Sequence, residues 1–439
     1  MNKYPRKVLV VAMLNSIHTA RWLSQFSDQK QYDFHLYSSN NALIHPQILN
    51  NKLFTIHQGD LEKVIKKINP DVIHTLEMQH SAYLVLSVRK RMKTFPLWFY
   101  TCWGSDILWF EKYKEHKKKI VEILGYIDAL FSEDEESIER ATEHYLYSKP
   151  FIKVPGPGGY KVNDMRKLVS FTPPSKRKII AVKGYSTWVY KPEILFSALK
   201  LNAKLIKKKN FKIIIYVPGD IKAYVDELRK EGINVELLNW TPNYEEILIL
   251  FSKSRINIAS SLSDGIPNSM LEGMVMGAFP IQSTSKTISR YIKSFKNGIL
   301  LKPLDVEGYS TAINKALTDD KIVDNAAIYN FDLIKNNFEY SDIKQKTLIF
   351  YNSFFKRINY NFNYLLKMYY WNLLGIRIKG NINIMKKYYL KYKYQLKPIL
   401  ANFLCKINPT YRKVLILNDR LIHLNNQLTI IIEKIDKLK

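Results

Sequence analysis

Residues 260–281 of this chain read SSLSDGIPNSMLEGMVMGAFPI, and this stretch decides the fold. It places two carboxylates, Asp264 and Glu272, eight positions apart. Between them lie a turn and the residues Asn268-Ser269-Met270, which the pattern predicts as the first turn of a helix. The unpaired N–H groups and the dipole of a helix N-terminus suit a phosphate. A phosphate site between two carboxylates that can each hold a hydroxyl group predicts a nucleotide-sugar as the ligand.

Short apolar runs alternate with amphipathic segments on both sides of this stretch. In the first part of the chain, the runs typical of strands are 7–13, 33–37, 53–57, 71–75, 97–101, 128–131 and 151–154. In the second part they are 178–182, 212–217, 234–237, 255–259 and 279–281. Helical patterns such as 19–26, 61–68 and 137–144 lie between them. The alternation predicts an α/β protein with two doubly wound, Rossmann-like domains that face each other across a cleft.

The clearest interruption of this pattern is the sequence PGPGG at 155–159. We therefore predict an N-terminal domain at 1–157 that holds the acceptor, and a linker at 158–177. A C-terminal donor domain follows at 178–330, and then a helix at 331–350 that returns towards the first domain. Ligands of such sheets bind beyond the carboxyl ends of the strands, so the loops at those ends are where site residues are expected.

Composition narrows the class of partner. The chain has 67 Lys and Arg against 39 Asp and Glu, a net charge of +28, which implies an anionic partner. The two cysteines are far apart and suit a reducing cytoplasm. The apolar run near the N-terminus lacks a cleavage site and is better interpreted as a strand. No apolar run reaches about 18 residues, so a membrane-spanning helix is not expected.

Two further segments follow the predicted domains. Residues 351–415 contain 13 Lys and Arg, ten Tyr and no Asp or Glu. This composition suits the headgroup region of an anionic membrane, although a basic helix pair packed on the enzyme remains the alternative. In 416–439, Leu and Ile from Leu417 to Leu438 follow a heptad spacing. That spacing predicts a helix for a homo-oligomeric coiled coil or for internal packing.

The stretch SDGIPNSMLEGM at 263–274, GAFPI at 277–281 and KNGILLKP at 296–303 resemble the donor-site signature of family-4 retaining glycosyltransferases with the GT-B fold. The resemblance covers roughly residues 5–350. It implies that Glu272 binds the nucleotide ribose and that Asp264 contacts the transferred sugar. Asp264 is one methylene shorter than the glutamate usual in that family. The alternative is a helix-capping Asp and a surface Glu. The other donor-binding residues implied by the resemblance are Lys183, Gly265, Ile266, Pro267, Asn268, Ser269 and Met270.

The same family carries a basic pair that neutralises the leaving diphosphate. Lys191 fits the second member of this pair, and Lys183 fits the first only loosely because it precedes Gly184. A solvated lysine on a surface loop is the alternative for both.

Two loops of the N-terminal half supply the remaining candidates. His18 follows the first predicted strand, where similar enzymes contact donor or acceptor, and the alternative is a helix cap. Asp106 ends Trp103-Gly104-Ser105-Asp106, which resembles the family's His-Gly-Ser-Asp loop with Trp in place of His. Asp106 is a candidate for orienting acceptor or sugar, against a turn-forming role. His74 and His80 are expected to be structural.

The resemblance implies a retaining hexosyltransferase that uses a UDP- or GDP-sugar and needs no cofactor. Neither an Asp-x-Asp motif nor a Cys/His cluster with metal spacing occurs, so no metal is expected. The basic aromatic segment suggests a lipid-linked saccharide acceptor, as in surface polysaccharide or lipopolysaccharide assembly at the inner face of the cell membrane. A degenerate sugar-nucleotide-binding scaffold is the main alternative. A nucleic-acid-binding protein is a remote one, since no binding module is recognisable and nucleic acid is not an expected partner.

Overall fold

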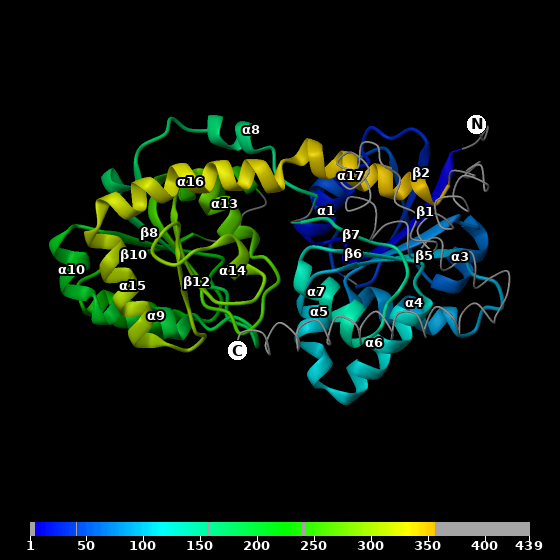
Figure 1. The fold of residues 1–439 in the computed structure, drawn as a ribbon, viewed down its shortest axis with the longest axis horizontal. Helices are drawn as coiled ribbons and strands as arrows, with labels where there is room; N and C mark the ends of the chain where they lie inside the picture. Colours follow the sequence, from blue (N-terminus) through cyan, green and yellow to red (C-terminus); the bar gives the residue numbers. More distant parts are fainter. Residues whose placement is uncertain (1–4, 41, 156–157, 239–242, 356–439) are drawn as a thin grey trace, which may run out of the picture. The chain divides into compact units, whose positions relative to one another are not determined.

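The computed structural model describes residues 5–40, 42–155, 158–238 and 243–355. Within these residues the chain forms two parallel sheets, coloured blue to cyan and green in Figure 1. The predicted architecture of two doubly wound domains is confirmed. The segments predicted as a membrane surface and as a heptad helix lie outside the described residues, apart from the first few positions after 350.

The first sheet has the strand order β3-β2-β1-β4-β5-β6-β7. Its strands are β1 (Arg6–Ala12), β2 (Tyr32–Ser38), β3 (Phe54–His57), β4 (Val72–Leu76), β5 (Leu97–Cys102), β6 (Ala129–Ser132) and β7 (Phe151–Lys153). Runs of Val, Ile and Leu make the central strands fully buried, as in Val8 to Val11 of β1. Strands buried on both faces by flanking helices are typical of parallel sheets.

The second sheet has the order β10-β9-β8-β11-β12-β13. Its strands are β8 (Ile179–Lys183), β9 (Lys212–Tyr216), β10 (Asn234–Leu238), β11 (Ser254–Ile258), β12 (Phe279–Ser283) and β13 (Ile299–Leu301). Every strand predicted from the sequence is present, with ends that differ by at most two residues. The three-residue strand β13 was not predicted from the sequence.

Helices connect the strands in both domains. In the first they are α1 (Ile17–Ser24), α2 (Pro46–Leu49), α3 (Leu61–Ile68), α4 (Tyr83–Arg89), α5 (Ser105–Leu108), α6 (Lys114–Tyr126) and α7 (Glu135–Glu139). In the second they are α9 (Pro192–Leu201), α10 (Ala203–Lys208), α11 (Lys222–Lys230), α12 (Tyr244–Lys253), α13 (Asn268–Met276), α14 (Ile288–Tyr291) and α15 (Val306–Thr318). None of the described helices is both long and apolar enough to cross a bilayer.

The predicted linker and return helix differ from the observed ones. The linker contains the helix α8 (Val162–Lys167), and Tyr160 and Val162 are buried in the core of the second domain. In place of one helix over 331–350, the chain forms α16 (Asp320–Phe338) and α17 (Tyr340–Ser353). The break between the two helices falls at Glu339, which forms a parallel β-bridge with Tyr160 of the linker. Tyr160 donates its N–H to Phe338 O and accepts from the Tyr340 N–H, both at 2.8 Å. These bonds hold Glu339 in an extended conformation.

Tyr351, near the end of α17, is fully buried in the first domain. Its ring contacts Phe26 and Phe99 at centroid distances of 5.1 Å each. Its hydroxyl lies 3.2 Å from Nδ1 of His74, whose Nε2 lies 2.8 Å from the Thr101 hydroxyl. The membrane segment was predicted to begin at 351, but this residue belongs to the core, so the boundary lies later. His74 is a structural histidine, as expected.

Replacing Tyr351 with alanine is expected to lower the free energy of unfolding by about 3–5 kcal/mol, because it removes a large ring from a packed core. The measurement is equilibrium unfolding in denaturant followed by tryptophan fluorescence. Ile349→Ala on the same helix is the matched control, because that side chain is 63% exposed and its loss leaves no cavity. Equal effects of the two substitutions would contradict the assigned packing.

Candidate active site

Both sheets reverse their strand order at one point, and the candidate site lies there. In the first sheet the reversal is between β1 and β4, and in the second it is between β8 and β11. The connections that leave these neighbouring strands run in opposite directions, which opens a crevice beyond their carboxyl ends. At the carboxyl ends of these strands lie His18 on α1 and His80 in the turn after β4, both in the first domain. In the second domain, Lys183 is the last residue of β8 and Asp264 follows β11.

The helix α13 begins at Asn268 after Pro267 and has no side-chain cap. The Met270 N–H donates to Pro267 O at 3.1 Å, whereas the N–H groups of Asn268 and Ser269 have no partner among the described residues. The sequence predicted that the N–H groups of Asn268, Ser269 and Met270 would face an anion, and the first two of these are available. The side chains of Ile266 and Met270 are buried in the core of the second domain, so only their backbone lies at the site.

Glu272 lies on α13 and is 5% exposed. Its Oε1 accepts a hydrogen bond from Nη1 of Arg21 on α1 at 2.9 Å, which joins the two domains. Arg21 also donates from Nη2 to the Tyr244 hydroxyl at 2.7 Å, and its guanidinium lies over the rings of Tyr244 and Tyr160. The alternative of a surface glutamate is wrong. In this structure the carboxylate that is predicted to bind ribose is held by an arginine.

Asp264 lies in the loop after β11 and accepts a hydrogen bond from the Tyr190 hydroxyl at 2.8 Å. Burial raises the pKa of this carboxyl, and the charge of Lys183 opposes the shift. A role as a helix cap is not observed, because α13 begins four residues later without a side-chain cap. The contact with Tyr190 brings the two loops of the second reversal point together.

Lys183 ends β8 and lies within electrostatic reach of both carboxylates. Burial lowers the pKa of its ammonium group, and the charges of Asp264 and Glu272 oppose this. The Nζ atom lies 3.9 Å from the centre of the Tyr190 ring. Among the described residues no carboxylate oxygen lies within 4 Å of it, so its charge is not taken up by an ion pair. A partly buried lysine of this kind is suited to bind an anion.

Lys191 has a different environment from Lys183. It precedes α9, and its backbone N–H donates to Ser260 O at 3.2 Å beside the bridge between Tyr190 and Ser261. In the described part of the chain its side chain makes neither a hydrogen bond nor an ion pair. The sequence favoured Lys191 over Lys183, whereas the structure places Lys183 beside the two carboxylates.

His18 connects the first domain to the start of α13. Its Nδ1 lies 3.3 Å from the Asn268 side-chain nitrogen, and its ring centre lies 5.6 Å from that of Trp103. Burial first, then the charges of Arg21 and Lys183, lower the pKa of His18 to about 4, so the imidazole is neutral at neutral pH. The alternative of a helix cap is wrong, because Ser16 caps α1 by accepting the His18 N–H.

The segment Trp103–Asp106 packs against the loop that contains Gly265. A Cβ atom on Gly104 would lie 2.9 Å from the Gly265 Cα, and Gly104 has φ of +80°, so glycine is required there. Asp106 is buried and accepts hydrogen bonds from the Tyr100 hydroxyl and the Trp103 N–H at 2.8 and 3.0 Å. Burial and the charge of Glu77 raise its pKa to about 7. These bonds give Asp106 the turn-forming environment that was the alternative to acceptor binding.

The hollows on the described surface include two that differ in size. One of about 30 Å³ lies beside Asp264 and is lined by residues such as Ser263 and Ser283. A larger one of about 670 Å³ lies at Lys296, Lys315 and Tyr329, away from both reversal points. The small volume beside Asp264 fits the close contact of the loops at Gly104 and Gly265. Size alone therefore does not identify the site.

Four residues of the site were missed by sequence reasoning. Arg21 lies one turn after His18 on the same helix, and this spacing was a usable signal. Tyr190 adjoins Lys191 in a loop already considered. Tyr160 and Tyr244 come from separate segments, and Tyr160 also contacts Asn268 by a hydrogen bond. The sequence gives no local signal for these two.

Two family models match consecutive parts of the chain. Residues 166–331 match the model described as Glycosyl transferases group 1, and residues 7–132 match the model described as Glycosyl transferase 4-like. No curated protein matches the chain. The two models correspond to the two domains and to the order expected from the resemblance.

Solved structures with similar folds include three bacterial proteins. A glycosyltransferase from Rickettsia africae aligns with TM-score 0.59 and 16% identity, over 81% of this chain and 100% of that one. Anabaena Alr3699/HepE in complex with UDP and glucose gives TM-score 0.62 and 14% identity, over 79% and 100%. The sucrose-phosphate synthase of Thermosynechococcus elongatus gives 0.57 and 13%, over 80% and 99%.

At these identities the solved structures establish the fold, and the two family models add the activity. The paired sheets, the uncapped start of α13 and the carboxylates beside it agree with both. The chain is therefore a glycosyltransferase with the GT-B fold.

Proposed function

We propose that this glycosyltransferase moves a hexose from a UDP- or GDP-sugar to a saccharide hydroxyl with retention of configuration. One observation carries the proposal. The ammonium group of Lys183 and the N–H groups of Asn268 and Ser269 form no hydrogen bond or ion pair among the described residues, and all three belong to the strands and connections at the reversal point of the second sheet. The departing diphosphate gains negative charge in the transition state, and preorganised donors of this kind stabilise such charge.

The carboxylates bind the two ends of the donor in this proposal. Glu272 accepts hydrogen bonds from the ribose once Arg21 releases it, and Asp264, held by Tyr190, contacts the transferred sugar. Arg21 and Tyr244 already form hydrogen bonds at the Glu272 end, which supports a polar ligand there.

Retention is proposed to follow from front-face attack assisted by the leaving phosphate, as the family resemblance implies. Lys183 and the helix start supply positive charge without a metal, so we propose a metal-independent reaction. The neutral imidazole of His18 contributes hydrogen bonds rather than charge, because its pKa is about 4.

The acceptor is proposed to be a lipid-linked saccharide in surface polysaccharide or lipopolysaccharide synthesis, used at the cytoplasmic face of the cell membrane. The net charge of +28 supports a site at an anionic membrane. The segment 351–415 also supports it, because it carries 13 Lys and Arg and no acidic residue. UDP is the first nucleotide to test, since the Anabaena neighbour was crystallised with UDP and glucose.

A catalytically degenerate sugar-nucleotide-binding scaffold is the second candidate. It is favoured by the fact that Arg21 and Tyr190 already occupy both carboxylates. Turnover distinguishes the two, because a scaffold binds the nucleotide but leaves the donor intact.

The test is thermal unfolding with UDP, GDP or ADP, followed by turnover of the corresponding hexose donors. A nucleotide at 100 times its Kd should stabilise the fold by about 2.7 kcal/mol and raise Tm. Inosine serves as the control that lacks a phosphate. Absence of stabilisation by all three nucleotides would remove the donor site from the proposal, and stabilisation without turnover would favour the scaffold.

A further inference from the structure

The loop after β4 carries a glutamate–histidine pair that the proposed function does not use. β4 ends at Leu76, and Glu77 then has φ of +73° before the π-helical turn Met78–Ala82 begins. A non-glycine residue at positive φ costs about 1–3 kcal/mol and is retained mainly where function requires it. Isolated π turns are also frequent at functional sites.

Glu77 holds the histidine in one orientation. Its carboxylate is 5% exposed and accepts the backbone N–H groups of His80 and Ser81. Its Oε1 also lies 3.1 Å from Nδ1 of His80. Because a carboxylate only accepts hydrogen bonds, Nδ1 carries the proton and the Nε2 of neutral His80 is left with its lone pair.

The free nitrogen of His80 is available to a ligand. The side chain is 57% exposed, and Nε2 has no hydrogen-bond partner among the described residues. The hydrogen bond to Glu77, against partial burial, raises the pKa of His80, with a smaller contribution from the charge of Asp106. Only the neutral imidazole has an acceptor lone pair on Nε2, so this role is lost as the pH falls through the raised pKa of His80. Glu77 and Asp106 are the charged groups that act on this imidazole.

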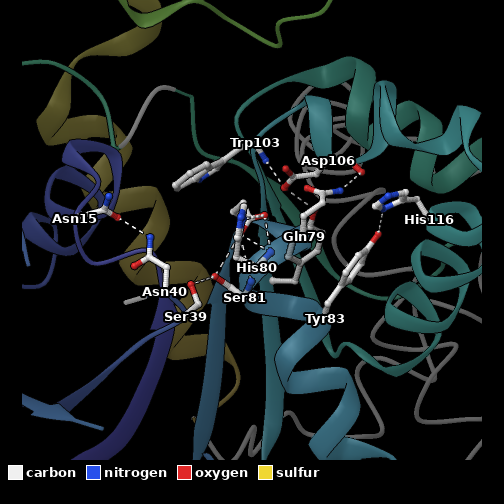
Figure 2. A network of polar contacts seen from close by, with 12 residues as sticks. Asn15, Ser39, Asn40, Gln79, His80, Ser81, Tyr83, Trp103, Asp106 and His116 are labelled. Carbon is white, nitrogen blue, oxygen red and sulfur yellow. Dashed lines mark hydrogen bonds and ion pairs between the residues drawn. The ribbon is translucent and has the colours of Figure 1, made fainter. Parts of the chain in front are cut away.

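Polar side chains surround His80 at the reversal point of the first sheet. Figure 2 draws it between Ser39 and Asn40 on one side and Asp106 on the other, below Trp103. The Ser81 hydroxyl lies 3.0 Å from that of Ser39. These side chains follow β2, β4 and β5, so they lie at the carboxyl ends of the strands. Hydroxyl, amide and imidazole groups in a crevice of this kind suit a sugar.

Trp103, which Figure 2 draws above His80, leads from these side chains towards the start of α13. Trp103 lies 5.6 Å from His18 between ring centres, and His18 contacts Asn268 at the start of α13. A hydroxyl group bound at His80 is thus on the acceptor side of the residues that bind the diphosphate.

We propose that Nε2 of His80 accepts a hydrogen bond from an acceptor hydroxyl group that neighbours the attacking one, and so orients the acceptor towards the donor sugar, with Glu77 as the positioning residue. This inference rests on the proposed function. The oxygen of the attacking hydroxyl group bonds to the anomeric carbon while the bond from that carbon to the phosphate oxygen breaks, and its one proton leaves with the departing phosphate. His80 supplies only a hydrogen bond to the neighbouring hydroxyl group or, when water attacks in the absence of a saccharide, to the second O–H of that water.

Donor hydrolysis tests this role because water then takes the place of the saccharide hydroxyl group. The donor is the one hydrolysed fastest among UDP-glucose, UDP-N-acetylglucosamine and GDP-mannose. Asparagine at position 80 places its amide close to the position that Nδ1 of the histidine occupied. Glutamine places its amide close to the position of Nε2. We expect His80→Ala and His80→Asn to lower kcat for hydrolysis by about 10-fold or more, and His80→Gln to retain clearly more activity. The Kd for UDP should be unchanged in all three.

His116→Gln is the matched control, because His116 lies on α6, away from the reversal point, and its Nδ1 lies 2.7 Å from the Tyr83 hydroxyl of α4. A purely structural role for His80 predicts the opposite order, with asparagine better than glutamine. That order, or unchanged hydrolysis in His80→Ala, would overturn the inference while leaving UDP binding intact. A wild-type protein that binds UDP but hydrolyses none of the donors overturns it too. Failure of the proposed function is recognised separately, by the absence of nucleotide binding.

Discussion

Replacing Lys183 with alanine is expected to lower the turnover number for sugar transfer by about 100- to 1000-fold, the usual cost of losing a preorganised charge-stabilising group. The reason is that Lys183 forms no ion pair among the described residues and lies within electrostatic reach of Asp264 and Glu272. Its charge acts mainly on the diphosphate that departs in the transition state, so the Kd of the intact donor should change much less than kcat. Steady-state kinetics with the best donor and a separate binding titration measure the two quantities.

Lys178→Ala is the control for this experiment. Lys178 immediately precedes β8, so it lies at the opposite end of the strand from Lys183, and it is exposed. Its substitution should leave kcat unchanged. Lys191→Ala decides between the two candidate lysines, since the structure predicts a smaller loss than for Lys183. A larger loss for Lys191 would show that the interpretation of the sequence was right and that the environment of Lys183 was misjudged.

Replacing Glu272 with glutamine is expected to raise the Kd for UDP by about 10- to 100-fold, because hydrogen bonds to a charged acceptor contribute about 1.5–3 kcal/mol. The glutamine keeps the size of the side chain but loses the charge that binds ribose hydroxyls. Isothermal titration with UDP measures the change. An unchanged Kd would mean that the ribose binds elsewhere.

The alanine variant of Glu272 has a second consequence, which separates binding from folding. It leaves Arg21 buried without its carboxylate, and breaking such a pair costs about 3–5 kcal/mol of stability. The double variant Arg21→Ala, Glu272→Ala should recover part of that stability without recovering UDP binding. Glu307→Ala, an exposed acidic residue in the first turn of α15, is the control for both measurements.

Local patterns predicted the strands and the donor loop well. β1 and β11 are short apolar runs between helical patterns, and this signal does not depend on the rest of the chain. The turn and helix start at Gly265–Asn268 were likewise predictable from a few adjacent residues. Which N–H groups are available to an anion was not predictable, because the Met270 N–H donates to Pro267 O within the same turn.

The contacts that complete the site were beyond the reach of local patterns. Arg21 and Glu272 are 251 positions apart, and their pairing depends on how the two domains meet. The sequence ranked Lys183 below Lys191, and no local pattern showed that Lys183 lies within electrostatic reach of Asp264 and Glu272. His80 was expected to be structural as a lone histidine, and nothing in the sequence linked it to Glu77, which becomes its hydrogen-bond acceptor through the π turn.

The position of Tyr351 also bears on the order in which the protein is made. Synthesis begins at the N-terminus, yet the aromatic core around Phe26 and Phe99 is completed by a ring that follows the whole second domain. The first domain therefore leaves the ribosome with an unfilled core, and the contact that fills it spans most of the chain. Contacts between residues so far apart in sequence form slowly, and the apolar surface of the first domain stays exposed until they form. The helix α17 thus makes the stability of the first domain depend on completion of the second domain.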